Sequence, residues 1–418
     1  MVRSQYDWDA GAEIKDHSLR KHKILREYFA KYLRVRCVSP FQEKFRLAVV
    51  DGFCGGGSYQ GGAQGSPLIF LEELKVASTE LNAVRSSQGL KPITIECLLI
   101  LNDKNPDAIE GLKLSLQLIE AEIRDRFRHL RIELRIFNQA FEEACPEIEE
   151  LLRRGGYQNA LFNLDQYGHN QVDRRTLQRI MRAPRASTEV FYTFSIQGLV
   201  SFLKRTDPAG LKAQLRYLDL PEDQLGIFWE PMSKGEFLGV AERLVFEAFE
   251  SCGTFHSPFS INNPGGWRYW LIHFSRSYRA RQVYNDVLHS NSTAQAHFGR
   301  SGLNMLSYDP MQEGGLYLFD LPGREQAKEQ LAEDIPRLVA GSGDAIQMEA
   351  FYEGIYNQTP AHADDIHETI MDHPDLEVLT DKHGKRRRGS SIRTSDVLRL
   401  KEQRTFFPLF SKPVGSSG

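Results

Sequence analysis

Short apolar segments alternate with segments of helical spacing through the first half of the chain. Apolar side chains recur every three or four positions between these segments, and also ahead of the first, in residues 16–33. Strands that alternate with helices build a parallel sheet through right-handed crossovers, with helices on both faces. The sequence therefore predicts an α/β fold with a doubly wound, mostly parallel, Rossmann-like sheet. The five predicted strands cover residues 45–50, 95–101, 131–137, 160–164 and 189–195.

The pattern changes after Ser195. Residues 199–250 have helical spacing interrupted by prolines, which indicates a helical insertion. The aromatic segment 267–274 predicts a late strand, and a mixed sheet closed by a hairpin strand is one outcome. We expect this first domain to cover residues 1–320.

Three helical segments followed by a turn-rich hairpin occupy the last part of the chain. This order is typical of a winged-helix unit, a relative of the helix-turn-helix. We expect a C-terminal winged-helix-like domain at 322–410 and a flexible tail at 411–418. The helical segments cover 324–339, 347–356 and 363–371, and the hairpin strands cover 376–379 and 391–397.

Charge is distributed unevenly along the chain. The net charge is −3, yet residues 376–418 contain ten basic and four acidic residues. A basic end on an acidic body indicates contact with nucleic acid, DNA or RNA, although a solvated charged hairpin fits the same pattern. The residues that we expect to contact phosphates lie at the hairpin tip: Lys385, Arg386, Arg387 and Arg388.

Composition narrows the class of protein further. Hydrophobic residues make up 41% and charged residues 26%, as in an ordinary globular protein. The five cysteines form no Cys-x-x-Cys pair, so neither a disulfide framework nor a metal site is expected. No long apolar run or signal peptide is evident, and we therefore expect a cytoplasmic protein with no membrane contact.

The glycine-rich loop after the first predicted strand carries the clearest functional signal. Asp51 ends the strand, and Gly55 and Gly57 follow in a Gly-Gly-Gly run that brings backbone N–H groups close to a ligand. No Gly-Lys-Ser/Thr follows, and the next helix begins only near Ser66, which argues against a P-loop or a dinucleotide fingerprint. Together with Asp103 at the end of the second strand, the spacing better fits S-adenosylmethionine. Asp51 would face the cofactor's ammonium and Asp103 its ribose.

A second polar group ends the fourth predicted strand. Asp165 and Tyr167 would lie beside the cofactor, where a carboxylate can orient or deprotonate an acceptor and a ring can stack on a flat one. A strand-to-helix turn with a capping Asp is the alternative interpretation. We take Asp165 and Tyr167 as candidate catalytic residues.

These motifs together resemble the three-Cys-motif partner (TcmP) family. The resemblance rests on the Ser-Leu-Arg-Lys-His-Lys helix from Ser18, the Asp-Gly-Phe-Cys-Gly-Gly-Gly loop from Asp51, Gly-Ser-Pro from Gly65, and Tyr-Trp-Leu-Ile-His-Phe-Ser from Tyr269. Further matches are Ala-Arg-Gln-Val from Ala280 and, near the C-terminus, residues 384–388, Asp396 and the pair Phe406-Phe407.

The resemblance implies a class I S-adenosylmethionine-dependent methyltransferase fold with a winged-helix-like end, and a partner protein that carries three cysteines. It adds Phe53 and Asn138 to the cofactor-binding set, since Asn138 stands where an acid often meets the adenine.

One departure bears on the reaction. Gln166 stands where the family tends to have the proline of an Asp-Pro-Tyr/Phe-Gly motif, so amino-methylation of a base is in doubt. Two functions follow. The chain is either a methyltransferase that acts on or with nucleic acid, or a non-catalytic nucleic-acid-binding or partner-binding subunit that keeps the fold. Nucleic-acid hydrolysis has no recognised carboxylate spacing to support it.

Overall fold

The computed structural model describes residues 12–196, 198–199, 208–221, 226, 234–261, 269–292, 295–298, 301–303, 305, 316–317 and 319–402. The chain divides into two compact units. The first consists of residues 1–298 and 314–320, and the second of residues 299–313 and 321–418.

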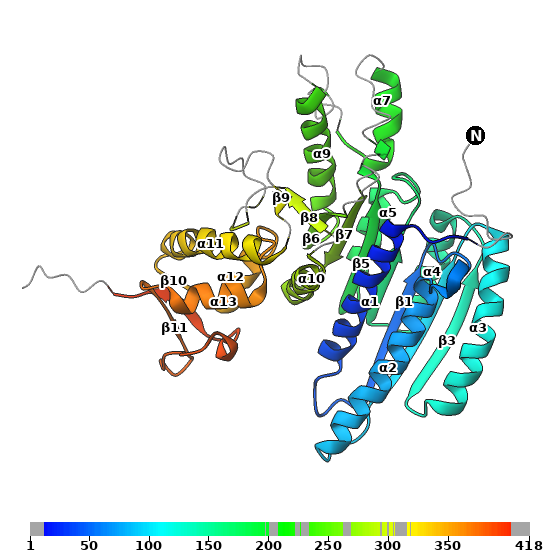
Figure 1. Cartoon of the computed structure of the whole chain (residues 1–418), viewed down its shortest axis with the longest axis horizontal. Coiled ribbons are helices and arrows are strands. Elements are labelled where there is room, and N and C mark those ends of the chain that lie inside the picture. The colour runs from blue at the N-terminus through cyan, green and yellow to red at the C-terminus, as the bar shows by residue number, and fades with distance from the viewer. Residues whose placement is uncertain are drawn as a thin grey trace, which may run out of the picture. The chain divides into compact units, whose positions relative to one another are not determined.

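Within its described residues, the first unit has one sheet of nine strands in the order β3-β2-β1-β4-β5-β7-β6-β8-β9. The first five strands along the chain run parallel to one another, and the other four join antiparallel beyond β5. The prediction of a doubly wound Rossmann-like sheet is confirmed, and β7 lies between β5 and β6 (Figure 1). The strands are β1 (Lys44–Asp51), β2 (Thr94–Asn102), β3 (Leu130–Phe137), β4 (Asn159–Leu164), β5 (Ser187–Phe194), β6 (Phe255–Ile261), β7 (Tyr269–Ser275), β8 (Gln295–Phe298) and β9 (Leu316–Tyr317).

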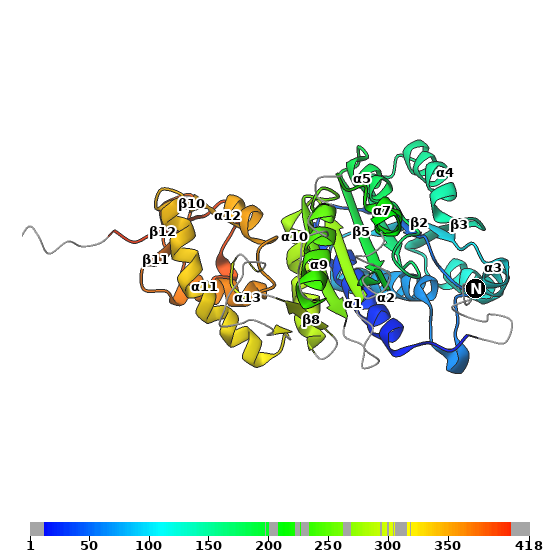
Figure 2. The same cartoon turned by 90° about the horizontal axis from the view of Figure 1, so that it is seen from above.

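Helices cover both faces of this sheet (Figure 2). The helices α4, α5 and α9 pack their apolar sides on one face, against residues such as Val50, Phe162 and Tyr192. On the other face, Tyr28 of α1 and Tyr284 of α10 pack edge-on against Phe191. The helices are α1 (Asp16–Arg36), α2 (Ser66–Ser87), α3 (Pro106–Arg126), α4 (Phe141–Arg154), α5 (Arg174–Arg182), α7 (Pro208–Leu215), α9 (Lys234–Glu250) and α10 (Tyr278–Ser290).

Burial explains why the parallel strands read as apolar runs. Leu47, Val49 and Val50 of β1 are fully buried, as are Leu99 and Ile100 of β2. A strand buried on both faces has no polar side to alternate with. Residues 267 and 268 of the predicted aromatic strand, and residues 200–207, 222–225 and 227–233 of the predicted insertion, lie outside the described residues.

The second unit is a winged helix. Its elements are α11 (Leu321–Gly341), β10 (Ala345–Gln347), α12 (Met348–Ile355), α13 (Ala363–Asp372), β11 (Leu376–Leu379) and β12 (Val397–Leu400). The strands pair in the order β10-β12-β11. The predicted winged-helix-like end is confirmed.

The prediction of a strand at 391–397 is wrong, because the strand starts only at Val397. Asp396 is fully buried, and its carboxylate accepts hydrogen bonds from the backbone N–H of Arg393 and the guanidinium of Arg386. These contacts hold the preceding residues in a turn, and a short 3-10 helix occupies Gly389–Ser391. Among the described residues, no helix is long and apolar enough to cross a membrane.

Candidate active site at the carboxyl edge of the sheet

The predicted site residues of the first unit lie at one edge of the sheet. Asp51 ends β1, Asp103 follows β2, Asn138 follows β3 and Asp165 follows β4, and these four strands are parallel. From β1 the chain proceeds outward through β2 to β3, and from β4 it proceeds in the opposite direction to β5, so the strand order reverses between β1 and β4. In open α/β sheets, ligands bind outside the carboxyl ends of the strands at such a switch point.

The glycine loop is fixed at both ends by hydrogen bonds. The N–H of Gly55 donates to Oδ2 of Asp103 (3.0 Å), and the N–H of Gly65 donates to the carbonyl of Gly57 (2.7 Å). Gly55 and Gly57 have φ angles of 60° and 80°, in the left-handed region that favours glycine. A Cβ added to Gly57 would lie 2.9 Å from Cδ1 of Leu112. The loop therefore requires glycine for both conformation and space.

Asp51 is completely buried beside this loop. Its Oδ1 accepts a 3.1 Å hydrogen bond from the side-chain amide of Asn163, at the end of β4. Burial raises the pKa of Asp51 to about 7, although hydrogen bonds from Ser66 and Asn163 oppose the shift. Oδ2 of Asp51 has no hydrogen-bond donor among the described residues. A buried carboxylate oxygen without a donor is costly, and a ligand cation would satisfy it.

Asp103 connects three neighbouring segments. Besides Gly55, its carboxylate accepts from the N–H of Asn105 (2.8 Å), and burial raises its pKa above the usual value. The side-chain amide of Asn138 donates to the carbonyl of Asp103 (2.8 Å). Each carboxylate oxygen can accept a second hydrogen bond, so Asp103 keeps capacity for ligand hydroxyl groups. Phe53 is half-buried on the same loop, with its ring centroid 5.8 Å from that of Phe141.

Helix α1 adds polar residues to this edge that the sequence did not assign to the site. Lys21 forms an ion pair with Asp165, and His17 and His22 are buried on the same side of the helix. Burial lowers the pKa of both histidines to about 4, so they are neutral at pH 7. A sequence signal was available: His17 and Lys21 precede Leu25 at four-residue intervals, on the buried stripe of the helix.

The ion pair sets the charge of Asp165. Burial alone would raise the pKa of this carboxyl, but the Lys21 ammonium and a hydrogen bond from Thr193 together lower it, so Asp165 is ionised at pH 7. The ring of His22 donates a hydrogen bond to the backbone carbonyl of Gln64. Its Nδ1 is buried and has no partner among the described residues. A cavity of about 10 Å³ is lined by these groups and by Asn163 and Thr193.

Tyr167 and Gln166 differ sharply in exposure. The Tyr167 side chain is 44% exposed and makes no side-chain contact with Asp165 that the structure describes. Gln166 is buried, and its Oε1 accepts a 2.8 Å hydrogen bond from the N–H of Gln171. A side-chain hydrogen bond therefore fixes the loop after β4, where the resemblance would place a proline.

The four basic residues predicted to contact phosphates lie in the second unit, in the wing between β11 and β12. Arg386 forms two hydrogen bonds to the buried Asp396 (2.8 and 2.9 Å). Lys385 lies 2.5 Å from a carboxylate oxygen of Glu377. Arg387 and Arg388 are exposed. The sequence could not separate these two pairs, because all four belong to one basic run.

Comparison with known families finds a winged helix in the same place. Residues 307–383 match a family model described as a GMT-like wHTH domain. The match includes α11, α12 and α13 with β10 and β11 and ends before β12, and winged helix-turn-helix domains are a class that commonly binds nucleic acid. The sheet-bearing unit lies almost entirely outside the match. Comparison with curated proteins finds no match.

Proposed function

We propose that the chain binds S-adenosylmethionine at the carboxyl edge of β1 and β2 and transfers its methyl group to nucleic acid. The observation that carries this proposal is the juxtaposition of Asp51, the glycine loop and Asp103 at the switch point of a doubly wound sheet. The resemblance to the three-Cys-motif partner family supports it, and with it a partner protein that carries three cysteines.

The residues at this edge fit the cofactor by their chemistry. Asp51 has an unpartnered carboxylate oxygen for the ammonium group, and Asp103 retains acceptor capacity for the ribose hydroxyls. The backbone at Gly55 and Gly57 presents no side chain to a ligand. Phe53 and Asn138 would complete the site around the adenine. When bound, the cofactor supplies a methyl group on a sulfonium, which is already activated for transfer.

On the acceptor side, the chain's own groups can orient a nucleophile and take its proton. Asp165 is an ionised acceptor that can hold an N–H or O–H of the substrate, and Lys21 keeps it in that state. A carboxylate with a lowered pKa is a weak base. His22 lines the same cavity and is neutral, but its pKa of about 4 makes it a weak base as well, so the main role of both groups is to orient the nucleophile.

Nucleic acid is the acceptor class that the rest of the chain supports. The winged-helix unit belongs to a class of nucleic-acid-binding domains, and its wing carries exposed arginines. Tyr167 is an exposed ring two residues after Asp165, and aromatic rings of this kind stack on unpaired bases.

A transfer assay tests the proposal. Methyl-labelled cofactor is incubated with the chain, with and without its three-Cys-motif partner, and with duplex DNA, single-stranded DNA or RNA. We expect label in one nucleic acid, and its loss in Asp165→Asn. Label that appears in none of them, with cofactor binding intact, would rule out nucleic-acid methylation.

A second function, a non-catalytic nucleic-acid-binding or partner-binding subunit, is favoured by one observation. The cavity beside Asp165 has room for about one water molecule and not for a base. A catalytic chain must open this cavity when substrate or partner binds, whereas a non-catalytic subunit need not. Nucleic-acid binding without transfer, even with the partner present, is the result that this second function predicts.

A further inference from the structure

The helices and the wing of the second unit carry opposite charges. Residues 348–372, which contain α12 and α13, include six acidic residues and no Lys or Arg. Residues 380–396, the wing, include six Lys or Arg and two acidic residues. The structure describes every residue of both segments. Two elements that a winged helix can both present to DNA therefore have fields of opposite sign.

Helix α13 turns carboxylates toward solvent. Asp364, Glu368 and Asp372 are exposed and lie four residues apart, on one face of the helix. The side chains of Asp364 and Glu368 are 72% and 57% exposed.

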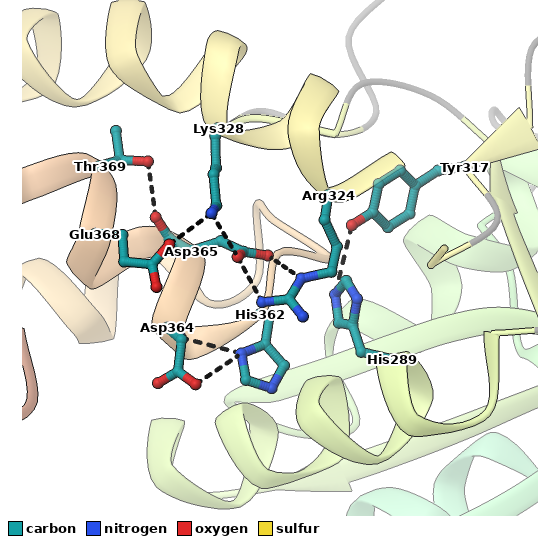
Figure 3. A network of polar contacts seen from close by, with 9 residues as sticks. All are labelled: His289, Tyr317, Arg324, Lys328, His362, Asp364, Asp365, Glu368 and Thr369. Carbon is teal, nitrogen blue, oxygen red and sulfur yellow. Dashed lines mark hydrogen bonds and ion pairs between the residues drawn. The ribbon is translucent and has the colours of Figure 1, made fainter. Parts of the chain in front are cut away.

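Two cations of α11 are paired with α13. Figure 3 shows Arg324 of α11 bound to Asp365 (2.8 and 2.6 Å), and Lys328 to Glu368 (2.5 Å). These ion pairs hold α13 against α11. Helix α13 itself contains no Lys or Arg, and its exposed residues Asp364 and Asp372 form no ion pair with α11 in the residues that the structure describes.

This face is unsuited to the major groove. In helix-turn-helix proteins, the N-terminal residues of the second helix of the motif meet base edges between two rows of phosphates. Here those residues include the exposed Asp364, whereas the neighbouring Asp365 is buried and paired with Arg324. Carboxylates in that position would be repelled by the phosphates.

The wing has both structural cations and cations without an internal partner. Asp396, completely buried, holds Arg386 in place, and Glu377 accepts ion pairs from Lys385 and Arg399. Lys382, Arg387 and Arg388 are exposed and form no ion pair with any residue from 319 to 402. The hydrogen bond from the N–H of Arg386 to the carbonyl of Val378 (2.8 Å) joins the segment before Arg387 to β11.

We infer that the winged-helix unit holds nucleic acid by its wing, through phosphates, and keeps α13 out of the groove. Arg387, Arg388 and Lys382 contact the backbone, while Arg386 is a positioning residue that shapes the wing. The inference rests on the proposed function only for its ligand, nucleic acid. Contacts to phosphates carry no base information, so binding is steep in salt and indifferent to sequence.

Fluorescence anisotropy on the full chain tests this inference. Two unrelated duplexes of about 20 base pairs are titrated at salt concentrations from about 50 to 200 mM, so that the slope of log affinity against log salt reports how many phosphates the protein neutralises. The variants are R387A/R388A in the wing and D364N/E368Q/D372N on α13. Arg337→Ala, an exposed cation of α11 paired with Glu333, is the matched control. Thermal melts confirm that each variant is folded.

We expect R387A/R388A to lower the slope by about two units, because each phosphate that is no longer neutralised removes about 0.9. The α13 variant should bind equally or more tightly, the Arg337 variant should be unchanged, and both duplexes should bind alike. An unchanged slope in R387A/R388A, or weaker binding by the α13 variant, would overturn the inference while leaving nucleic-acid binding in place. No binding to either duplex overturns it together with the nucleic-acid part of the proposed function, and cofactor titration then tests the methyltransferase part separately.

Discussion

The side-chain amide of Asn163 donates a 3.1 Å hydrogen bond to the carboxylate of Asp51. Asn163 is in β4 and Asp51 ends β1, so this bond crosses the point where the direction of the sheet connections reverses. On one side lies the glycine loop with Asp103, and on the other lie Asp165 and Lys21. The proposed cofactor and acceptor halves of the site are therefore joined through buried polar groups.

Asp51→Asn is expected to stabilise the protein and abolish cofactor binding. The folded pKa of Asp51, about 7, exceeds the ordinary value of 3.8, so the folded chain binds more protons between these values. The free energy of unfolding of the wild type therefore falls as pH rises from about 4 to about 7, and stays low above that. Asparagine does not ionise, so the variant lacks this destabilisation. Its free energy of unfolding at pH 8 should exceed that of the wild type by up to about 4 kcal/mol. Urea denaturation of both proteins at pH 5 and pH 8 measures their free energies of unfolding. The same change between the two pH values in both proteins would contradict the prediction.

Asp103→Ala should weaken S-adenosylmethionine binding by about 1–3 kcal/mol, the scale of removing hydrogen bonds to a charged group. The substitution removes the acceptor that holds the N–H of Gly55 as well as the ribose acceptor. Asp107→Ala is the matched control, because Asp107 is an exposed carboxylate in the first turn of α3. Calorimetry on both variants checks the prediction. Equal affinity of the Asp103 and Asp107 variants would show that Asp103 does not hold the cofactor.

Lys21→Met should change the pH dependence of methyl transfer. The ammonium is what keeps the pKa of Asp165 below its ordinary value, so without it burial raises that pKa. Asp165 is then protonated up to a higher pH, and the rising limb of the pH–rate profile moves toward alkaline pH. Lys23→Met on the same helix is the control, since the Lys23 side chain is 62% exposed. Superimposable profiles for the two variants would refute a role for the Lys21–Asp165 pair.

Asp396→Asn should destabilise the wing, because it breaks the ion pair between this carboxylate and Arg386. The substitution leaves the Arg386 guanidinium without its anion in the wing. Hydrogen exchange at the amides of Thr380 and Arg386, which bond within the wing, should accelerate. In Arg387→Ala the same amides should remain protected, because Arg387 has no ion pair among the described residues of the wing. Unchanged protection in Asp396→Asn would mean that this pair does not shape the wing.

Most of the parallel half of the sheet was predictable because β1, β2, β4 and β5 are buried on both faces and end at polar or glycine residues. The apolar runs before Asp51 and Asp103 are typical of buried strands. Because these two strands are parallel, both acids lie at one edge of the sheet. The winged helix was predictable for a similar reason, since three amphipathic segments precede a charged turn. β10 was missed because three residues are too few to show a period.

Contacts between distant segments were not predictable from spacing. Lys21 and Asp165 are 144 residues apart, and nothing in the pattern around Lys21 distinguishes a buried lysine from a solvated one beyond its position on the apolar stripe. In the wing, the partners of Lys385 and Arg386 are set by how the segment 385–386 pairs with β11 and by the turn that ends at Asp396. A shift of one residue would place those side chains on the opposite face.

Calorimetric titration of the purified chain with S-adenosylmethionine and S-adenosylhomocysteine tests whether the carboxyl edge of β1 and β2 binds the cofactor. We expect micromolar binding of both ligands to the wild type and none to Asp51→Asn, which should be at least as stable. Absence of binding to the folded wild type would contradict the assignment of this edge as a cofactor site.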